Sequence, residues 1–352
     1  MRTIDRPHLL AALALLLAAL TLGTLCAPVV PAADYAEKLD AAARMQACMD
    51  RVREYKEALG LGVSADDLRG TGMIGEPYTF ITTTSGALEA KRTTADPDMA
   101  ALVVQLLHEA GVRAGDTVGA GFSGSFPAMN LAVLCACAAM DVRVVCIASV
   151  GASTYGANQP ELTYPDMALR LAADGLIPLP DAFSMGGWRD CGLDMDPELA
   201  AQIRARLEAS GVPMLYEEDF AANLAARRQL YADKGPISCF IGVGGNLSTI
   251  GQGEDTVPYG LVPPQTVKRT DAGSGLLELY NAEGLPVLHL LNIKRLVADY
   301  GLPYDPQQPT VPGESAVYHT KRFPPAAAVL GLCGALALLA HGRAKRREED
   351  AP

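Results

Sequence analysis

The sequence has little positive charge, few aromatic side chains and a single tryptophan. Its 352 residues include 29 Lys and Arg against 40 Asp and Glu, which gives a formal net charge of -11. Because nucleic-acid binding needs a basic face, this balance argues against a nucleic-acid partner. Apolar residues make up 49% of the chain, so it can bury a substantial core.

Motifs for metals and nucleotides are missing as well. No group of His, Cys and Asp residues has the spacing of a zinc site, and no C-x-x-C pair occurs. The phosphate-binding motif G-x-x-x-x-G-K-[ST] is absent too. We therefore predict no metal and no cofactor, and the chain is not expected to be an ATP-dependent ligase. The eight cysteines nominate no disulfide pair.

Charge is absent from two long apolar stretches, residues 9–27 and 323–341. A helix needs about 20 apolar residues to cross the hydrocarbon core of a membrane, so both stretches are predicted to be transmembrane helices. The first has an alternative interpretation as a signal peptide, in which residues 1–32 are removed after Val30-Pro31-Ala32. The alternative for the second is a buried core helix.

The basic residues near these stretches predict the orientation of the chain. Arg2 and Arg6 precede the first stretch, and Arg343 and residues 345–347 follow the second. Basic flanks stay in the cytoplasm, so both termini, including the charged tail at 342–352, are expected there. The domain at 35–320 would then lie outside the cytoplasm, anchored in the cell (inner) membrane.

Between the two stretches, strand patterns alternate with helix patterns. Strands separated by helices of 10–15 residues indicate a mostly parallel, doubly wound sheet, Rossmann-like or sugar-isomerase-like. The predicted strands are 79–84, 117–121, 142–149, 237–243 and 286–291. The predicted helices are 35–59, 96–110, 127–140, 165–173, 196–210, 217–233 and 292–300. The stretches 251–275 and 303–315 are expected to be loops.

Three of the predicted strands end in loops of small and hydroxyl residues: 119–130, 149–160 and 242–253. Loops at the carboxyl ends of parallel strands gather at one edge of the sheet, where ligands bind. Glycines let the backbone approach a ligand, and free N–H groups favour anions. The alternative is that these loops are ordinary connectors. The predicted ligand-binding residues are Ser123, Gly124, Ser125, Ser153, Thr154, Asn158, Gly244, Gly245, Asn246 and Ser248.

The first loop also has a catalytic interpretation. Gly121-Phe122-Ser123-Gly124-Ser125 lies between a strand and a helix, like a nucleophile elbow, but it ends in Ser where the G-x-S-x-G pattern has Gly. A serine hydrolase would need His289 as base and Asp255 or Asp271 as its partner. His289 lies in a predicted buried strand, so the competing interpretation is a core histidine. The same loop resembles the sugar-phosphate loop of the sugar isomerase domain, whose serines hold the phosphate.

Longer segments carry a resemblance that covers most of residues 5–320. They are GFSGSFPAMNLA, ASVGASTYGANQPELTYPDM, FIGVGGNLSTIGQG, VPYGLVPP and GLPVLHLLNIKRLVADYGLPYDP, in this order after an N-terminal apolar segment. The chain resembles the poly-gamma-glutamate system protein family. The resemblance implies a role in poly-gamma-glutamate capsule biosynthesis, beside the ligase and membrane subunits of the synthase, and brings no assigned catalytic residue.

Three hypotheses about function follow. The first is a membrane-anchored accessory component of poly-gamma-glutamate synthesis and export, which binds the polymer or partner subunits. The second is an envelope hydrolase or transferase that acts on the polymer with Ser123 as nucleophile. The third is a domain that binds a small anionic ligand of the sugar-phosphate type. The sequence does not decide whether the protein is an enzyme.

Overall fold

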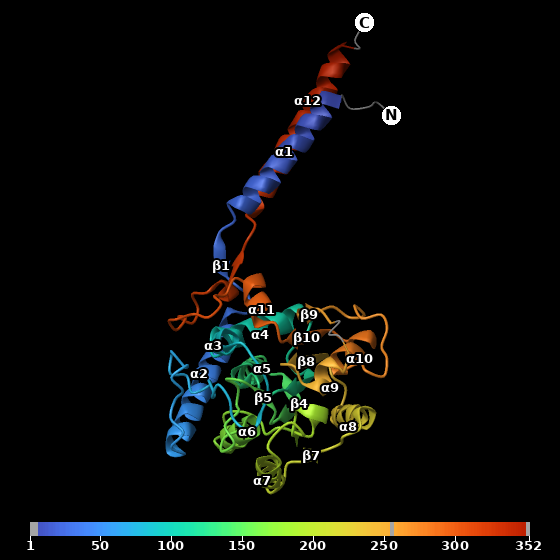
Figure 1. The fold of residues 1–352 in the computed structure, drawn as a ribbon. Coiled ribbons are helices and arrows are strands. Elements are labelled where there is room, and N and C mark those ends of the chain that lie inside the picture. Colours follow the sequence, from blue (N-terminus) through green and yellow to red (C-terminus); the bar gives the residue numbers. More distant parts are fainter. Residues whose placement is uncertain (1–5, 254–256, 350–352) are drawn as a thin grey trace. The chain divides into compact units, whose positions relative to one another are not determined.

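The computed structural model describes residues 6–253 and 257–349, and they form two compact units (Figure 1). The first unit is drawn from Met1–Ala32 and His319–Pro352, and the second is Ala33–Tyr318. The chain thus leaves the first unit, builds the whole of the second and returns to the first.

The first unit is a pair of helices joined to a short two-stranded sheet. Helix α1 (Arg6–Leu25) packs along α12 (Pro325–Glu349), and β1 (Val29–Pro31) pairs antiparallel with β11 (His319–Lys321). A Cβ atom on Gly331 would lie 2.6 Å from Ala19 Cβ. The absence of a side chain at this position therefore lets the two helices approach closely.

Both helices of this unit are long and apolar enough to cross a membrane. Their leucines are largely exposed, which a water-facing helix would avoid. The sequence predicts spans at 9–27 and 323–341, and the helices begin and end a few residues away from those bounds.

The second unit is an α/β domain with a mostly parallel seven-stranded sheet. Its strand order is β7-β6-β4-β3-β8-β10-β9, and only β9 runs antiparallel to its neighbour. The strands are β3 (Thr117–Phe122), β4 (Arg143–Ser149), β6 (Ala182–Ser184), β7 (Met214–Leu215), β8 (Cys239–Val243), β9 (Gly260–Val262) and β10 (Val287–Leu290). A separate parallel pair is formed by β2 (Thr82–Thr84) and β5 (Ala152–Ser153).

Helices cover both faces of the large sheet. They are α2 (Tyr35–Ala58), α3 (Leu88–Thr94), α4 (Asp98–Glu109), α5 (Pro127–Ala139), α6 (Tyr164–Ala173), α7 (Pro197–Glu208), α8 (Phe220–Asp233), α9 (Leu247–Ile250), α10 (Leu276–Ala282) and α11 (Ile293–Asp299). Two short 3₁₀ turns lie at Trp188–Asp190 and Ala316–Tyr318.

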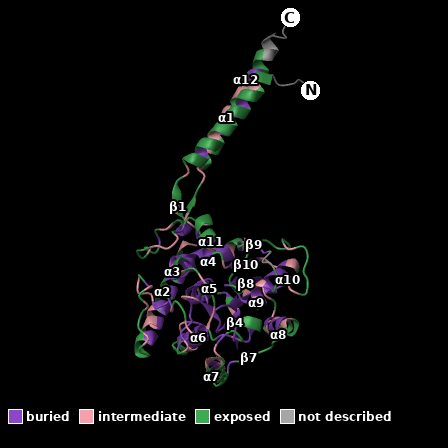
Figure 2. Ribbon diagram, viewed as in Figure 1, coloured by how far each residue is buried: buried purple, intermediate pink, exposed green. Residues whose placement is uncertain are grey.

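The core divides by strand alternation into two apolar layers. Along β4, Cys146 and Ala148 face the layer that contains α2, α4, α5 and α6, whereas Val145 and Ile147 face the layer with α8 and α10. Successive side chains of a strand point to opposite faces, so a continuous apolar run such as β4 is buried on both sides. Figure 2 shows the sheet and the inner helices as buried.

Glycine determines how closely one of these layers approaches the sheet. A Cβ atom on Gly242 of β8 would lie 2.5 Å from Thr249 Cγ2 and 3.0 Å from Leu277 Cδ1. A larger residue would therefore push α9 and α10 away from the strand. Helix α9 lies within the predicted loop 242–253, so the glycine helps to fix this loop at the end of β8.

The structure differs from the expected elements mainly in short segments. The predicted loop at 251–275 contains β9, and the sequence patterns did not indicate β6, β7, α3 or α10. Elements of two to seven residues give too few apolar repeats for a clear period. All eight cysteines are free.

Candidate functional site

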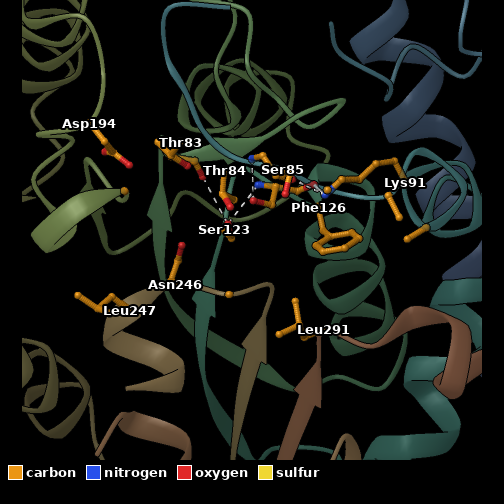
Figure 3. A pocket seen from close by; sticks show the side chains of 18 of the residues that line it. Thr83, Thr84, Ser85, Lys91, Ser123, Phe126, Asp194, Asn246, Leu247 and Leu291 are labelled. Carbon is orange, nitrogen blue, oxygen red and sulfur yellow. Dashed lines mark hydrogen bonds between the residues drawn. The ribbon is translucent and has the colours of Figure 1, made fainter. Parts of the chain in front are cut away.

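The three predicted loops meet at one cavity of about 490 Å³ (Figure 3). Strands β3, β4 and β8 are neighbours and run parallel, so their carboxyl ends lie at one edge of the sheet. Ser123 follows β3, Gly151 follows β4 and Asn246 follows β8, and all three line the cavity.

A fourth wall comes from a segment that the sequence analysis did not assign to the site. Residues 83–87 and the first turns of α3 line the cavity. Thr84 of β2 pairs with Ser153 of β5, which brings this segment against the second loop. Phe126, Trp188, Asp194, Leu247 and Leu291 complete the lining.

Serine side chains bind the first two loops to each other. Ser123 Oγ accepts a hydrogen bond from the backbone N–H of Ser125 at 3.1 Å, and donates one to the carbonyl of Gly151 at 3.4 Å. Ser125 Oγ accepts from the backbone N–H of Ser153 at 2.9 Å. These serines are almost fully buried, so their first role is to fix the loops around the cavity.

The cavity contains one buried cation, Lys91 of α3. Its Nζ donates to Ser153 Oγ at 2.8 Å and to the carbonyl of Ser125, and it lies 3.5 Å from the centre of the Phe126 ring. Only 3% of Lys91 is exposed, and burial lowers its pKa to about 7. No carboxylate among the described residues pairs with it. Buried charges in proteins are normally paired, and the described residues provide no carboxylate for Lys91 when it is protonated.

Asn246 lines the opposite wall. Its Nδ2 donates to the carbonyl of Phe122 at 3.1 Å and to Ser149 Oγ at 3.0 Å. Both amide hydrogens are thus used inside the domain, and the side chain points into the cavity (Figure 3).

Two of the predicted ligand residues are occupied by internal contacts. Thr154 Oγ1 accepts from the N–H of Gly86 at 2.8 Å and donates to the carbonyl of Gly86 at 3.0 Å. Asn158 is fully buried and bonds to both the N–H and the carbonyl of Glu76, each at 2.9 Å. Neither lines the cavity, and both instead attach the fourth wall to the second loop.

The remaining predicted residues serve the loops in different ways. Gly245 lines the cavity, whereas Gly124 and Gly244 do not. A Cβ on Gly124 would lie 2.5 Å from the carbonyl oxygen of Val150, and Gly244 adopts a positive φ of 77°. Ser248 is buried in α9, and its Oγ has no hydrogen-bond partner among the described residues.

His289 lies apart from Ser123. It is buried in β10, beside Gly242 of β8, which in turn pairs with Gly121 of β3. Two strand spacings, roughly 10 Å, separate the backbones of β10 and β3. His289 is also not among the residues that line the cavity with Ser123. His289 Nδ1 instead lies 3.2 Å from the carbonyl oxygen of Val257.

Neither predicted carboxylate partner of His289 contributes to the cavity that the structure describes. Asp255 lies outside the described residues, and Asp271 is not among those that line the cavity. No group of three or more His, Cys, Asp or Glu residues within 6–253 and 257–349 could hold a metal ion.

Comparison with models of protein families, with functionally characterised proteins and with solved structures gave no match for this chain. The geometry of the cavity therefore carries the functional argument.

Proposed function

We propose that the protein is a membrane-anchored binding protein whose cavity holds an anionic group of its ligand. The observation that carries this proposal is Lys91, a buried cation at the cavity wall without a carboxylate partner. A carboxylate or phosphate bound beside Lys91 would supply the missing counter-charge, and Ser153 would add a hydroxyl contact.

The arrangement of the sheet supports a ligand at this place. From β3 the chain proceeds through β4, β6 and β7 in one direction, and then returns to β8 on the other side of β3. With helices on both faces, we interpret this as a doubly wound, Rossmann-like or sugar-isomerase-like sheet. Ligands of such sheets bind in the crevice where the strand order reverses, which is the position of the cavity.

The resemblance to poly-gamma-glutamate system proteins suggests a ligand class. Each unit of a gamma-glutamyl chain carries one free carboxylate, which fits a cavity with a single cation. Residues 35–322 contain 23 basic and 35 acidic residues, so the domain as a whole repels a long polyanion. We therefore propose an accessory component of poly-gamma-glutamate synthesis and export that holds a short segment of the polymer beside the ligase and membrane subunits.

The membrane topology is part of the proposal. Helices α1 and α12 would span the inner membrane, with both termini in the cytoplasm and the α/β domain outside. Their length, their apolar surfaces and the basic residues beyond them support this arrangement.

The experiment that tests the proposal is a binding titration of short gamma-glutamyl oligomers to the full chain in detergent. Trp188, the single tryptophan, lines the cavity and provides a fluorescence signal. We expect Lys91→Met to weaken binding by about 10-fold or more, since a charge-assisted hydrogen bond contributes roughly 1.5–3 kcal/mol.

A matched control is Lys56→Met. Lys56 is another buried lysine, but its Nζ donates to the carbonyl of Ile74 and it does not line the cavity. This variant should bind the oligomers as the unchanged protein does. Equal binding by Lys91→Met would contradict the proposal. Tighter binding of glucose 6-phosphate than of the oligomers, still dependent on Lys91, would favour the sugar-phosphate hypothesis.

A second function is favoured by the same contact between Lys91 and Ser153. Their 2.8 Å distance suits a lysine that takes the proton of a serine nucleophile, and a pKa near 7 leaves part of the amine neutral. Ser153 Oγ would attack the gamma-amide carbonyl, the C–N bond would break, and Lys91 would pass the proton to the leaving amine. Water would then hydrolyse the ester.

The two functions differ in their pH dependence and in their residues. Anion binding needs protonated Lys91 and should weaken as the pH rises from 6 to 9, whereas turnover needs neutral Lys91 and should increase. If Ser123 were the nucleophile, as in the sequence-based hydrolase hypothesis, Ser123→Ala would abolish shortening of the polymer. If Ser153 were the nucleophile, Ser153→Ala would do so. We expect no shortening by the unchanged protein.

A further inference from the structure

Asn246 presents a fixed hydrogen-bond acceptor to the cavity. Its Nδ2 faces the carbonyl of Phe122, and because a carbonyl only accepts hydrogen bonds, the amide nitrogen must be on that side. The oxygen Oδ1 then faces the other way. No hydrogen bond of the described residues ends on Asn246 Oδ1, although only 7% of the residue is exposed.

A buried chain of hydrogen bonds prevents this amide from turning over. Asn246 Nδ2 contacts Ser149 Oγ at 3.0 Å, Ser149 Oγ contacts Ser184 Oγ at 2.9 Å, and Ser184 Oγ donates to Asp190 Oδ1 at 3.2 Å. The carboxylate of Asp190 can only accept, so each hydroxyl in the chain donates towards it.

Two further buried side chains hold Asp190 in place. The guanidinium of Arg227 pairs with Asp190 Oδ2, and Asn223 Nδ2 donates to this oxygen at 3.1 Å. All three residues are nearly fully buried. The direction of the whole chain, and with it the outward direction of Asn246 Oδ1, is therefore determined by an ion pair far inside the domain.

Asp194 adds a second acceptor at the same side of the cavity. Its Oδ1 accepts from the backbone N–H of Trp188 at 2.8 Å, and the side chain is exposed to the cavity. Lys91 lies on the opposite side, as Figure 3 shows. The cavity thus has acceptors at one end and a cation at the other.

We propose that the cavity recognises a ligand with an amino group at one end and a carboxylate at the other, such as the first two units of a gamma-glutamyl chain, with the amine on the first unit and the carboxylate on the second. The amine would bind Asn246 Oδ1 and Asp194, and the carboxylate would bind Lys91. This inference rests on the proposed function, because it assumes that Lys91 holds a carboxylate. It limits the ligand to a chain end rather than the interior of the polymer.

The test compares two ligands that differ only at the amine, gamma-glutamylglutamate and its N-acetyl derivative, by calorimetric titration of the full chain in detergent. Acetylation removes the positive charge and two hydrogens of the amine. We expect it to weaken binding by about 10-fold or more, because a site with fixed acceptors loses their partners. Lys91→Met should weaken the binding of both ligands by a similar factor.

Variants at the acceptor end should change the ratio of the two affinities. Asp194→Asn removes the negative charge, and Ser149→Ala releases one hydrogen of Asn246 Nδ2, so both should bring the ratio closer to one. Asp299→Asn, at an exposed ion pair outside the cavity, should leave the ratio unchanged. Unfolding temperatures of the variants show whether they remain folded.

Equal, Lys91-dependent binding of both ligands by the unchanged protein would overturn this inference and leave the proposed function standing. A ratio that neither Asp194→Asn nor Ser149→Ala alters would also overturn it, since the amine would then be recognised elsewhere. If neither ligand binds, the proposed function fails as well.

Discussion

Three lysines of the α/β domain are buried, and they differ in what surrounds their charge. Lys38 has the carboxylate of Asp34 at 3.0 Å. Lys56 has the nearby charge of Asp67, which partly opposes the lowering of its pKa by burial. Lys91 has hydroxyl, carbonyl and aromatic contacts only, and burial alone accounts for its lowered pKa. Under the proposed function, this difference explains why Lys91, and not Lys38 or Lys56, would bind an anion.

At the residue scale, Lys91 makes the stability of the protein without ligand depend on pH. Its pKa is about 7 in the folded state and near 10.5 in the unfolded state. Between these values the unfolded state binds more protons, so the folded state should gain stability as the pH rises from about 7 towards 10. Below pH 7 Lys91 is protonated in both states, so its burial destabilises the folded state by the full amount.

Lys91→Met should remove this contribution. The slope of the free energy of unfolding against pH should then fall by at most about 1.4 kcal/mol per pH unit. The measurement is urea unfolding of the full chain in detergent at pH 7, 8 and 9, followed by circular dichroism. Identical slopes for the variant and the unchanged protein would mean that Lys91 is not buried as a neutral amine. Lys56→Met is a matched comparison: burial lowers the pKa of Lys56 to about 8, so this variant should reduce the slope only above about pH 8.

The sequence could identify the serines of the site but not this lysine. Ser123, Ser125 and Ser153 follow apolar strand patterns in glycine-rich loops, and that context is visible in the chain. Lys91 lies in a short helix whose sequence, LEAKRTT, looks like any solvated helical turn. Its burial results from long-range packing on Phe126 and Ser153, which local patterns do not encode.

At the scale of elements, the fourth wall of the cavity depends on one buried amide. Asn158 of the second loop donates to the carbonyl of Glu76 and accepts from its N–H, and its Nδ2 also contacts Thr82 Oγ1 at 3.0 Å. These bonds fix the segment that leads to residues 83–87. The predicted ligand residue Asn158 thus shapes the cavity from outside it.

Asn158→Ala should therefore destabilise the domain by about 2–4 kcal/mol, because two backbone groups of Glu76 would lose their buried partners. It should also weaken ligand binding, since residues 83–87 would no longer be held in place. Thermal unfolding followed by circular dichroism measures the first effect. Gln159→Ala is the control, because Gln159 has only one long contact, at 3.4 Å to Glu76 Oε1. A larger loss in the control than in Asn158→Ala would contradict this role.

Element lengths explain which parts of the fold the sequence could predict. The buried strands β3, β4, β8 and β10 and the helices α2, α4, α5 and α8 have clear patterns, and they appear within a few residues of the predicted bounds. The short strands β6, β7 and β9 have two or three residues each and depend on their neighbours for pairing. Such strands extend the sheet without leaving a periodic signal.

At the scale of the whole molecule, the two apolar segments at the ends of the sequence build the first unit together. The chain segments on both sides of the α/β domain come together as β1 with β11 and α1 with α12. If one helix crosses a membrane, the other therefore crosses it too, and in the opposite direction. Both junctions with the domain then lie on the same side of the membrane.

This arrangement makes a topology experiment informative at both junctions. A periplasmic reporter such as alkaline phosphatase, fused after residue 60 or after residue 320, should be active in both fusions, whereas a cytoplasmic reporter at the same positions should be inactive. The reason is that Arg2, Arg6 and the basic residues after 341 are expected to keep both termini in the cytoplasm. Changing the basic residues at 343–347 to Gln is a matched test of this cause, and we expect it to lower the fraction of chains with the predicted orientation.

Membrane retention of a chain that lacks residues 323–352 separates the remaining alternatives. An uncleaved α1 keeps it in the membrane, whereas cleavage after residue 32 releases it. Cytoplasmic activity of either fusion would place the cavity on the side where the polymer is made, and the proposed role in holding exported chains would have to be abandoned.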